Sequence, residues 1–488
     1  MGVPRSLILI TVDCLRADHV GFLGYEHSTT PFLDSLAPQS IVMRNAIVAG
    51  APTYYSFPVI MASRYPLALG RDVVGLFPNE ATIATTLKES GYATAAFIAG
   101  NPYLSRPFGY DSGFGIFHDF LNSADSRSDV TEPDNARMRG KLNQLLNSAA
   151  HKFALTGSVY DELYFQYCQQ TPDVSKSFDE LRRFPAADMI VDEACAWLAD
   201  VTDQPFFLWL HFMDPHAPYY PKEDALGLHK SKGMDTSRAR YLNSFWNRSD
   251  IGLSRLKRCR EEVISLYDAG IRWVDTQVAR LVDSLRIAGR WKECVFALTA
   301  DHGEEFLDHS GRYHAPSKIN EELIRVPLIV SAPDIEHGST PESPFSLLHL
   351  APTLLDAMTR PASASFNGRS FWSQWQKGES WDEPAIIECV ADCTNPFRPE
   401  NRLGPRILGI RETRYKLVLN FATSTEQMFD LQNDPSEIHP LGIHEQKPAR
   451  KRLLQSAFKH VVESTQSRDP EHRLHAQLRD IQLELAHS

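Results

Sequence analysis

The sequence predicts an α/β fold in which a large, mostly parallel central sheet is flanked by helices, with a small antiparallel subdomain near the C-terminus. Two observations predict it. Short apolar runs alternate with helix-prone stretches through most of the chain, as in parallel sheets with helical crossovers. After about residue 375, short strands separated by tight turns replace this alternation. The 488 residues are enough for a large catalytic domain with a smaller companion.

The strands expected in the central sheet are continuous runs of aliphatic and aromatic residues. Such runs are typical of strands that are buried on both faces. They cover Leu7–Val12, Ala93–Ala99, Phe206–Phe212, Cys294–Thr299 and Val326–Val330. The stretches between them have helical character at Thr82–Ser90, Ala187–Ala199 and Leu256–Ile287.

We expect a catalytic domain over residues 1–375, interrupted by a polar, helix-prone insertion at about 121–185. A second segment, Leu226–Asp250, is expected to be irregular and to form a lid or wall. Residues 376–440 should form the antiparallel subdomain, and residues 441–488 a helical tail. The subdomain includes a hairpin of Ile407–Glu412 and Tyr415–Asn420.

The composition disfavours several classes of protein. The formal charge of −11 gives no general attraction to nucleic acid. No stretch has the roughly 18 consecutive apolar residues of a membrane span, and the apolar run near the N-terminus is interpreted as the first strand. Seven scattered cysteines form no pattern of paired spacings, which favours a reducing, cytoplasmic compartment.

Candidate metal ligands follow two of the predicted strands. Asp13 comes directly after the first strand, and Asp301 and His302 follow the strand near 294–299. Ligands bind at the carboxyl edge of parallel sheets, and a carboxylate beside an imidazole suits a divalent cation. Each aspartate taken alone could equally be a turn or helix-capping residue.

A candidate nucleophile precedes a short predicted helix. Pro58 is best tolerated near a helix start, which places that start around Ser56. The helix N-terminus would then favour an anionic ester beside Thr53. Without other evidence Thr53 is an ordinary loop threonine.

Several motifs together resemble the sulfatase family of the alkaline phosphatase superfamily. They occur in the family's order from residue 7 to about residue 437. They are Asp13-Cys-Leu-Arg-Ala-Asp-His19 with Thr29-Thr-Pro31, the run Phe206–Tyr219, Leu266-Tyr267 with Trp273-Val-Asp275, Asp301-His-Gly-Glu304, Arg325-Val-Pro327, Ala351-Pro-Thr353, and Met428-Phe-Asp-Leu431 with Asp434-Pro435.

The resemblance implies an alkaline-phosphatase-like fold in which Asp13, Asp301 and His302 bind a metal, with Thr53 as nucleophile and fourth ligand. Three positions depart from the family's pattern: Cys14 replaces a second acid, Tyr55 a proline and Ser63 a glycine. Threonine cannot be converted into the formylglycine of true sulfatases. The threonine type resembles phosphoethanolamine transferases and lipoteichoic acid synthases.

The resemblance also assigns residues to the substrate. His216 and His314 match positions that protonate the leaving group or stabilise charge. Asn101 and Tyr103, together with Arg16 of the first motif, are expected to bind the substrate. His211, which lies within a buried strand, is interpreted as a hydrogen-bonded core residue.

We therefore expect a hydrolase of phosphate or sulfate esters that acts through a covalent Thr53 intermediate. Its cofactor would be one divalent ion, with Mn²⁺ or Zn²⁺ favoured and Ca²⁺ or Mg²⁺ possible. The alternatives are a phosphotransferase and a degenerate, non-catalytic protein that binds anions. The expected partner is a small-molecule ester, and a homo-oligomer remains possible.

Overall fold

The computed structural model describes residues 5–68, 74–121, 177–201, 204–228, 234–335, 337–391 and 404–466, together with 393 and 402. Most of the insertion expected at 121–185 and the end of the expected tail, residues 467–488, lie outside the described residues. Of that insertion the structure describes a short helix, α6 (Phe178–Leu181), capped by Ser177. None of the described helices is both long enough and apolar enough to cross a membrane.

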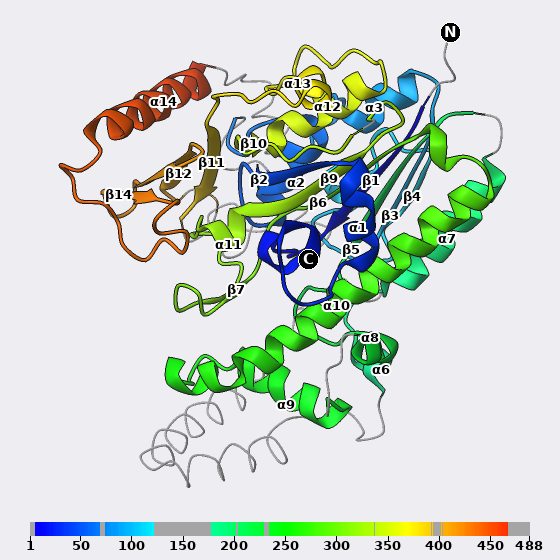
Figure 1. Ribbon diagram of the computed structural model, residues 1–488, viewed down its shortest axis with the longest axis horizontal. Helices are drawn as coiled ribbons and strands as arrows, with labels where there is room; N and C mark the ends of the chain where they lie inside the picture. The colour runs from blue at the N-terminus through cyan, green and yellow to red at the C-terminus, as the bar shows by residue number, and fades with distance from the viewer. Residues whose placement is uncertain are drawn as a thin grey trace.

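An eight-stranded sheet forms the centre of the molecule, and most of its strands are parallel, as predicted (Figure 1). Its strand order is β10-β2-β9-β6-β1-β5-β3-β4. The bounds are β1 Ser6–Val12, β2 Ile41–Ile47, β3 Ala93–Ile98, β4 Ile116–His118, β5 Phe206–Phe212, β6 Cys294–Ala300, β9 Arg325–Ser331 and β10 Phe345–Ser346. The strand β9 is antiparallel to both of its neighbours, β2 and β6.

The first strand of the chain lies in the middle of this sheet. All seven residues of β1 are buried, which explains its unbroken apolar sequence. It pairs in parallel with β5 on one side and β6 on the other. In register, Val12 is opposite Phe212 of β5 and Ala300 of β6. The loops that follow these three strands therefore leave the sheet at the same edge.

Helices cover the sheet in two groups that lie on opposite sides of it (Figure 1). One group contains α1, α7, α8, α9 and α10, and the other contains α2, α3, α12 and α13. Their bounds are α1 Pro31–Leu36, α2 Thr53–Ala62, α3 Ile83–Glu89, α7 Ala187–Asp200, α8 Glu223–Leu228, α9 Thr236–Asn247, α10 Leu253–Ile287, α12 Leu350–Ala357 and α13 Trp372–Lys377. A short helix, α11 (Glu321–Ile324), leads into β9.

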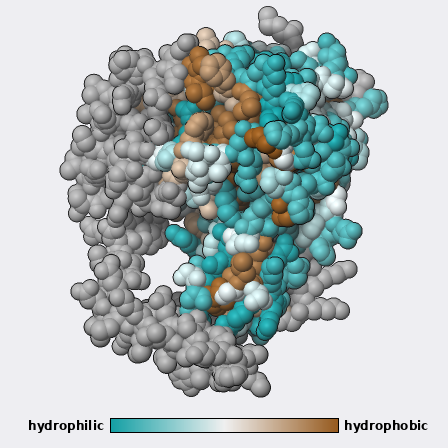
Figure 2. Space-filling view, turned by 90° about the vertical axis from the view of Figure 1, so that its left-hand side faces the viewer, coloured by the Kyte–Doolittle hydropathy of each residue, from teal (hydrophilic) through white to brown (hydrophobic). Residues whose placement is uncertain are grey.

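The C-terminal part of the chain forms a separate four-stranded antiparallel sheet, as predicted. Its strands are β11 Ala385–Val390, β12 Arg406–Arg411, β13 Tyr415–Asn420 and β14 Thr425–Asp430. The expected hairpin is β12 with β13. The helix α14 (Lys447–Gln466) packs on this sheet through Leu453 and Ala457. Seen from this side, the described surface is mostly hydrophilic with a band of hydrophobic residues (Figure 2).

Two details of the sequence prediction are wrong. The helix expected to start near Ser56 starts at Thr53, so Pro58 lies inside α2. Because all ten residues of α2 are buried, tertiary packing offsets the backbone hydrogen bond that Pro58 cannot donate.

The segment Leu226–Asp250, expected to be irregular, contains the end of α8 and the whole of α9. The side chain of Asp235 caps α9 by accepting a hydrogen bond from the Arg238 amide at 2.7 Å. Residues Ala239, Leu242 and Trp246 recur at helical spacing and are buried. The prediction gave too much weight to the polar residues between them.

Candidate metal centre and active site

The two aspartates predicted to bind metal meet where parallel strands β1 and β6 end. Val12 is paired with Ala300, so Asp13 and Asp301 are the next residue on each strand. One ligand atom from each of Asp13, Asp301 and His302 lies within 4.8 Å of the others, and all three residues are buried. The carboxyl edge of the sheet thus brings together side chains that are nearly 300 residues apart in the sequence.

Thr53 reaches the same point from the first turn of α2. Its Oγ1 lies 3.2 Å from Nε2 of His302. The two atoms belong to buried side chains. All four residues predicted to surround one metal ion therefore converge, and Thr53 lies at the N-terminus of a ten-residue helix, where the helix dipole favours an anion.

These residues fit a divalent cation because their charges are not otherwise balanced. Oδ2 of Asp301 is buried and has no hydrogen-bond partner among the described residues. Burial, followed by the charge of Asp13, raises the pKa of Asp301 to about 8. Two adjacent buried carboxylates are costly without a cation, and an imidazole and a hydroxyl complete a mixed oxygen and nitrogen ligand set.

Asp13 is held as a carboxylate by donors from neighbouring strands. Burial raises its pKa, but His216, when it is protonated in acid, and a hydrogen bond from His211 outweigh burial, so the pKa lies below its usual range. Nδ2 of Asn101 donates to Oδ2 of Asp13 at 2.9 Å. Such hydrogen bonds orient a ligand before metal binds.

His211 is a buried core residue, as expected, but it has a second contact that the sequence analysis missed. Its Nδ1 lies 2.9 Å from the Thr11 hydroxyl, and its Nε2 lies 3.4 Å from Oδ2 of Asp13. The pairing of Thr11 with His211 across β1 and β5 produces this contact. The sequence analysis could not predict this contact, because the sequence does not show which strands pair or in what register.

Two further histidines lie beside the ligands. The ring centroid of His314 is 4.5 Å from that of His302 and 5.2 Å from that of His216. Burial would lower the pKa of His314, but Glu304, whose Oε1 lies 3.3 Å from Nδ1 of His314, raises that pKa to about 9. Burial lowers the pKa of His216. One imidazole is therefore protonated near neutral pH while the other is neutral.

Cys14 occupies the position where the resemblance led us to expect a second acid. It has a positive φ of 61°, and its Sγ lies 3.1 Å from Oδ1 of Asp13 and 3.4 Å from Nδ1 of His314. Burial, followed by the charge of Glu304, raises the pKa of the Cys14 thiol. The thiol therefore stays protonated next to the carboxylates.

Aromatic side chains form one wall of the site. The ring of Tyr103 is 5.3 Å from that of Tyr54, the residue after Thr53. The amide of Tyr103 donates to Oδ1 of Asn101 at 3.0 Å, which fixes the Asn101 amide toward Asp13. Asn101 and Tyr103 thus lie close to the four candidate ligands, where the sequence analysis expected substrate contacts.

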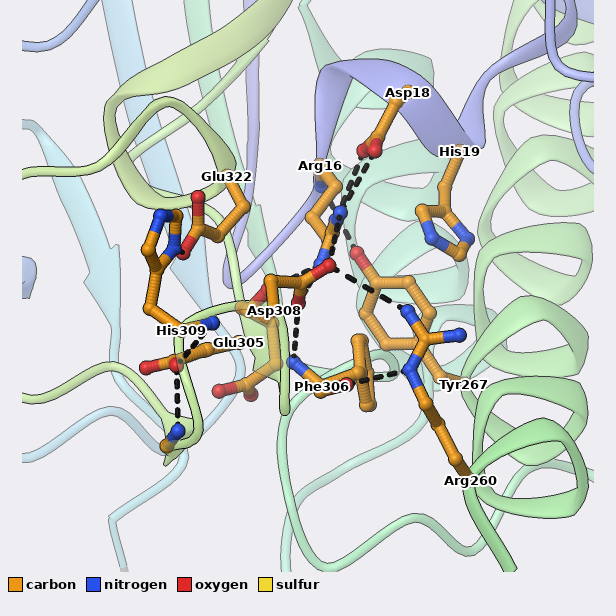
Figure 3. Close-up of polar contacts among 12 residues, drawn as sticks. Arg16, Asp18, His19, Arg260, Tyr267, Glu305, Phe306, Asp308, His309 and Glu322 are labelled. Atoms are coloured by element: carbon orange, nitrogen blue, oxygen red, sulfur yellow. Dashed lines mark hydrogen bonds and ion pairs between the residues drawn. The ribbon is translucent and has the colours of Figure 1, made fainter. Parts of the chain in front are cut away.

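Arg16 has different partners from those expected. Its guanidinium donates to Asp18 at 2.7 Å, to Asp308 at 2.9 Å and to the Glu304 carbonyl at 2.9 Å (Figure 3). The residue is only 4% exposed. Its amide donates to the hydroxyl of Tyr267 on α10, which in turn donates to the Cys14 carbonyl. With its donors used in this way, Arg16 holds the loops that carry the candidate ligands.

Comparisons with known proteins agree with this arrangement. A family model described as Sulfatase matches residues 5–360, and a model described as N-sulphoglucosamine sulphohydrolase, C-terminal, matches residues 312–466. The multifunctional alkaline phosphatase superfamily protein PehA of Trinickia caryophylli is 22% identical over 90% of this chain and 91% of its own length. An arylsulfatase of Clostridium perfringens is 23% identical over 89% of each chain.

Solved structures share the fold at low sequence identity. A protein solved with its substrate D-glucosamine-2-N,6-O-disulfate superposes with a TM-score of 0.71 and 16% identity, covering 96% of this chain and 99% of that one. The phosphonate monoester hydrolase of Agrobacterium radiobacter gives a TM-score of 0.67 and 19% identity, covering 95% and 96%.

Proposed function

Because the chain belongs to the sulfatase family, whose model matches residues 5–360, we propose that it is a metal-dependent hydrolase of phosphate or sulfate esters with Thr53 as its nucleophile. The observation that carries the proposal is the 3.2 Å approach of the Thr53 hydroxyl to His302, beside Asp13 and Asp301. A hydroxyl among buried metal ligands is the arrangement that activates a weak nucleophile.

In the first step, the Thr53 hydroxyl loses its proton to solvent, and Oγ1 attacks the phosphorus or sulfur atom of the ester in line with the leaving oxygen. The bond from that atom to the leaving oxygen breaks, and a covalent threonine ester forms. Water then attacks the same phosphorus or sulfur atom, which releases phosphate or sulfate and restores the Thr53 hydroxyl. If another alcohol replaced water, the product would be a transferred group.

His314 is the better placed donor for the leaving oxygen. With a pKa raised to about 9 by Glu304, its imidazolium is present at neutral pH. His216, whose pKa is lowered by burial, is neutral and can accept a proton from the attacking water. Their ring centroids are 5.2 Å apart, so both histidines lie close enough to act on the same ester group.

Asp13, Asp301, His302 and Thr53 would hold the metal. When bound, a divalent ion supplies Lewis-acid chemistry: it favours the Thr53 alkoxide and neutralises negative charge on the transferring group. Mn²⁺ or Zn²⁺ is favoured over Ca²⁺ because the ligand set includes an imidazole. Until a metal is bound, Asn101 and His211 keep Asp13 oriented toward the site.

The named relatives suggest which esters to test. They include an arylsulfatase, a choline-sulfatase of Rhizobium meliloti and a phosphonate monoester hydrolase. We propose the cytoplasm as the compartment, because the six described cysteines are free thiols.

The decisive experiment compares four 4-nitrophenyl esters, namely the phosphate monoester, a phosphodiester, a phosphonate monoester and the sulfate. Each is assayed after removal of metal and reloading with Mn²⁺, Zn²⁺, Mg²⁺ or Ca²⁺. Turnover of at least one ester that depends on the added ion is expected. Absence of turnover with every ion, alongside retained binding of inorganic phosphate or sulfate, would instead favour a non-catalytic anion-binding protein.

A further inference from the structure

A short segment after α6 is fixed rigidly against the loop that carries His216. The guanidinium of Arg182 donates to Oδ1 of Asp214 at 2.7 Å and to the Tyr220 carbonyl at 2.8 Å. The same Asp214 oxygen accepts a hydrogen bond from the amide of Ala187, at the start of α7. The residues between Arg182 and Ala187 therefore have a defined position beside the active site.

Phe184 of this segment lies between two parts of the site. Its ring centroid is 5.3 Å from that of His216, with the two planes nearly perpendicular at 82°. A Cβ atom added to Gly100 would lie 3.7 Å from Cδ1 of Phe184. Gly100 precedes Asn101, which bonds Asp13, so Phe184 lies between His216 and the turn that orients a metal ligand.

Arg183 places a positive charge beside Phe184. Its side chain is exposed, and its guanidinium carbon lies 5.3 Å from the centroid of the Phe184 ring, within the range of a cation–π contact. No carboxylate of the described residues forms an ion pair with it. Arg16 and Arg182, in contrast, are buried in ion pairs.

The charge of Arg183 also acts on Tyr103. Burial raises the pKa of Tyr103 to about 12, and the nearby Arg183 guanidinium opposes that rise. Tyr103 lies against Tyr54 next to the nucleophile. Arg183 is exposed and contacts the Phe184 ring, which in turn contacts His216, so its charge lies beside the site.

We propose that Arg183 binds a second anionic group on the leaving alcohol, so that the preferred substrate is a phosphate or sulfate ester whose alcohol half carries a carboxylate, sulfate or phosphate. The inference rests on the proposed function. A guanidinium binds planar or tetrahedral oxyanions through paired hydrogen bonds, which a neutral substituent cannot accept equally well. Cζ of Arg183 and the ring centroid of His216 each lie 5.3 Å from the centroid of the Phe184 ring, so both groups contact the same side chain.

The test uses three phosphate esters with similar nitrophenol leaving groups: 4-nitrophenyl, 3-carboxy-4-nitrophenyl and 3-carbamoyl-4-nitrophenyl phosphate. If the sulfates are the esters that turn over, the corresponding sulfates replace them. The quantity compared is the ratio of kcat/KM for the carboxylate probe to that for the carbamoyl probe. The ratio is expected to be about tenfold in the wild-type protein, as for a charge-assisted hydrogen bond, and to fall close to one in Arg183→Gln. Arg183→Lys should give an intermediate ratio.

Arg286→Gln provides the matched control, because Arg286 is an exposed arginine at the end of α10 that pairs with Asp283. Its ratio should equal that of the wild type. A wild-type ratio near one, or an unchanged ratio in Arg183→Gln, would overturn the inference while leaving the proposed function intact. Failure of the metal-loaded wild type to hydrolyse any of the probes would instead count against the proposed function.

Discussion

The Thr53 hydroxyl lies 3.2 Å from Nε2 of His302, although 249 residues separate the two in the sequence. Helix α2 supplies the hydroxyl, and the loop after β6 supplies the imidazole. Both side chains are buried, so the pair is shielded from bulk water. Thr53 and His302 could therefore hold the same divalent ion.

Replacing Thr53 should separate binding from chemistry. Thr53→Ala removes the attacking oxygen, so kcat should fall by at least about 10³-fold. Thr53→Ser keeps a hydroxyl and should retain measurable turnover. The covalent intermediate can be sought by acid quenching with a slow substrate and mass spectrometry of the peptide that carries residue 53. Equal activity in Thr53→Ala and the wild type would remove Thr53 from the mechanism.

Asp301→Asn should have opposite effects with and without metal. The pKa of Asp301 in the folded protein, about 8, lies above its ordinary value of 3.8. A raised pKa contributes stability that is present below pH 4 and is lost as the pH rises through 8. The metal-free variant should therefore melt at a higher temperature than the metal-free wild type at pH 8, and by a smaller margin at pH 5.

With Mn²⁺ or Zn²⁺ the order should reverse, because a bound ion stabilises the wild type in proportion to its affinity. Calorimetry of ion binding checks this directly. Asp283→Asn, at an exposed site on α10, is the control and should change neither quantity. A variant that binds the ion as tightly as the wild type would exclude Asp301 as a ligand.

His314→Gln should impair esters with poor leaving groups most. General acid catalysis typically contributes about 10²- to 10⁴-fold, and an acidic phenol leaves without a proton. A plot of log kcat/KM against the pKa of the leaving phenol should become steeper in the variant. If His216→Gln steepens that plot and His314→Gln does not, the roles of the two histidines are exchanged.

Arg16→Gln should lower the stability of the fold more than it weakens substrate binding. Its guanidinium is buried against Asp18, Asp308 and the Glu304 carbonyl (Figure 3). Removing one partner of a buried ion pair costs about 3–5 kcal/mol, so urea denaturation should occur at a lower concentration. A higher KM with unchanged unfolding would show that Arg16 binds substrate after all.

The stability of the protein should also depend on pH through His309, which is not one of the proposed ligands. A hydrogen bond to Glu322, 2.6 Å long, raises the pKa of His309 from 6.5 to about 9. The stabilisation is complete below pH 6.5 and is lost as the pH rises through 9. His309→Gln should therefore destabilise the protein at pH 6, by no more than about 1 kcal/mol because solvent screens the pair, and the difference should shrink by pH 10. Thermal melts across this range provide the measurement.

The sequence predicted those parts of the structure that follow from local pattern. Strands β1, β5 and β6 are continuous apolar runs because both of their faces are covered. Asp13 and Asp301 follow two of these runs directly, so their meeting at one sheet edge could be expected. The direction of β9 could not be predicted, because this strand is as apolar as its neighbours yet runs antiparallel to them.

Features that depend on tertiary contacts were missed. Thr53 was singled out by resemblance, since a threonine at a helix start has no distinctive local pattern. The contact of His211 with Asp13 depends on the pairing of β1 with β5, and that of Glu304 with His314 depends on the fold of the intervening loop. The ion pair of Arg16 with Asp308 could not be predicted from the sequence, because 292 residues separate the two.

The central position of β1 has a consequence for synthesis on the ribosome. The hydrogen bond between Thr11 and His211 can form only after 200 further residues have been synthesised. The hydrogen bond from the Cys14 amide to Asp301 needs 287 further residues. During translation this apolar strand therefore has both edges unpaired, which exposes it to aggregation and makes it a natural client segment for chaperones. A nascent chain released before residue 301 would lack two of the proposed ion ligands, Asp301 and His302, however well its first half had folded.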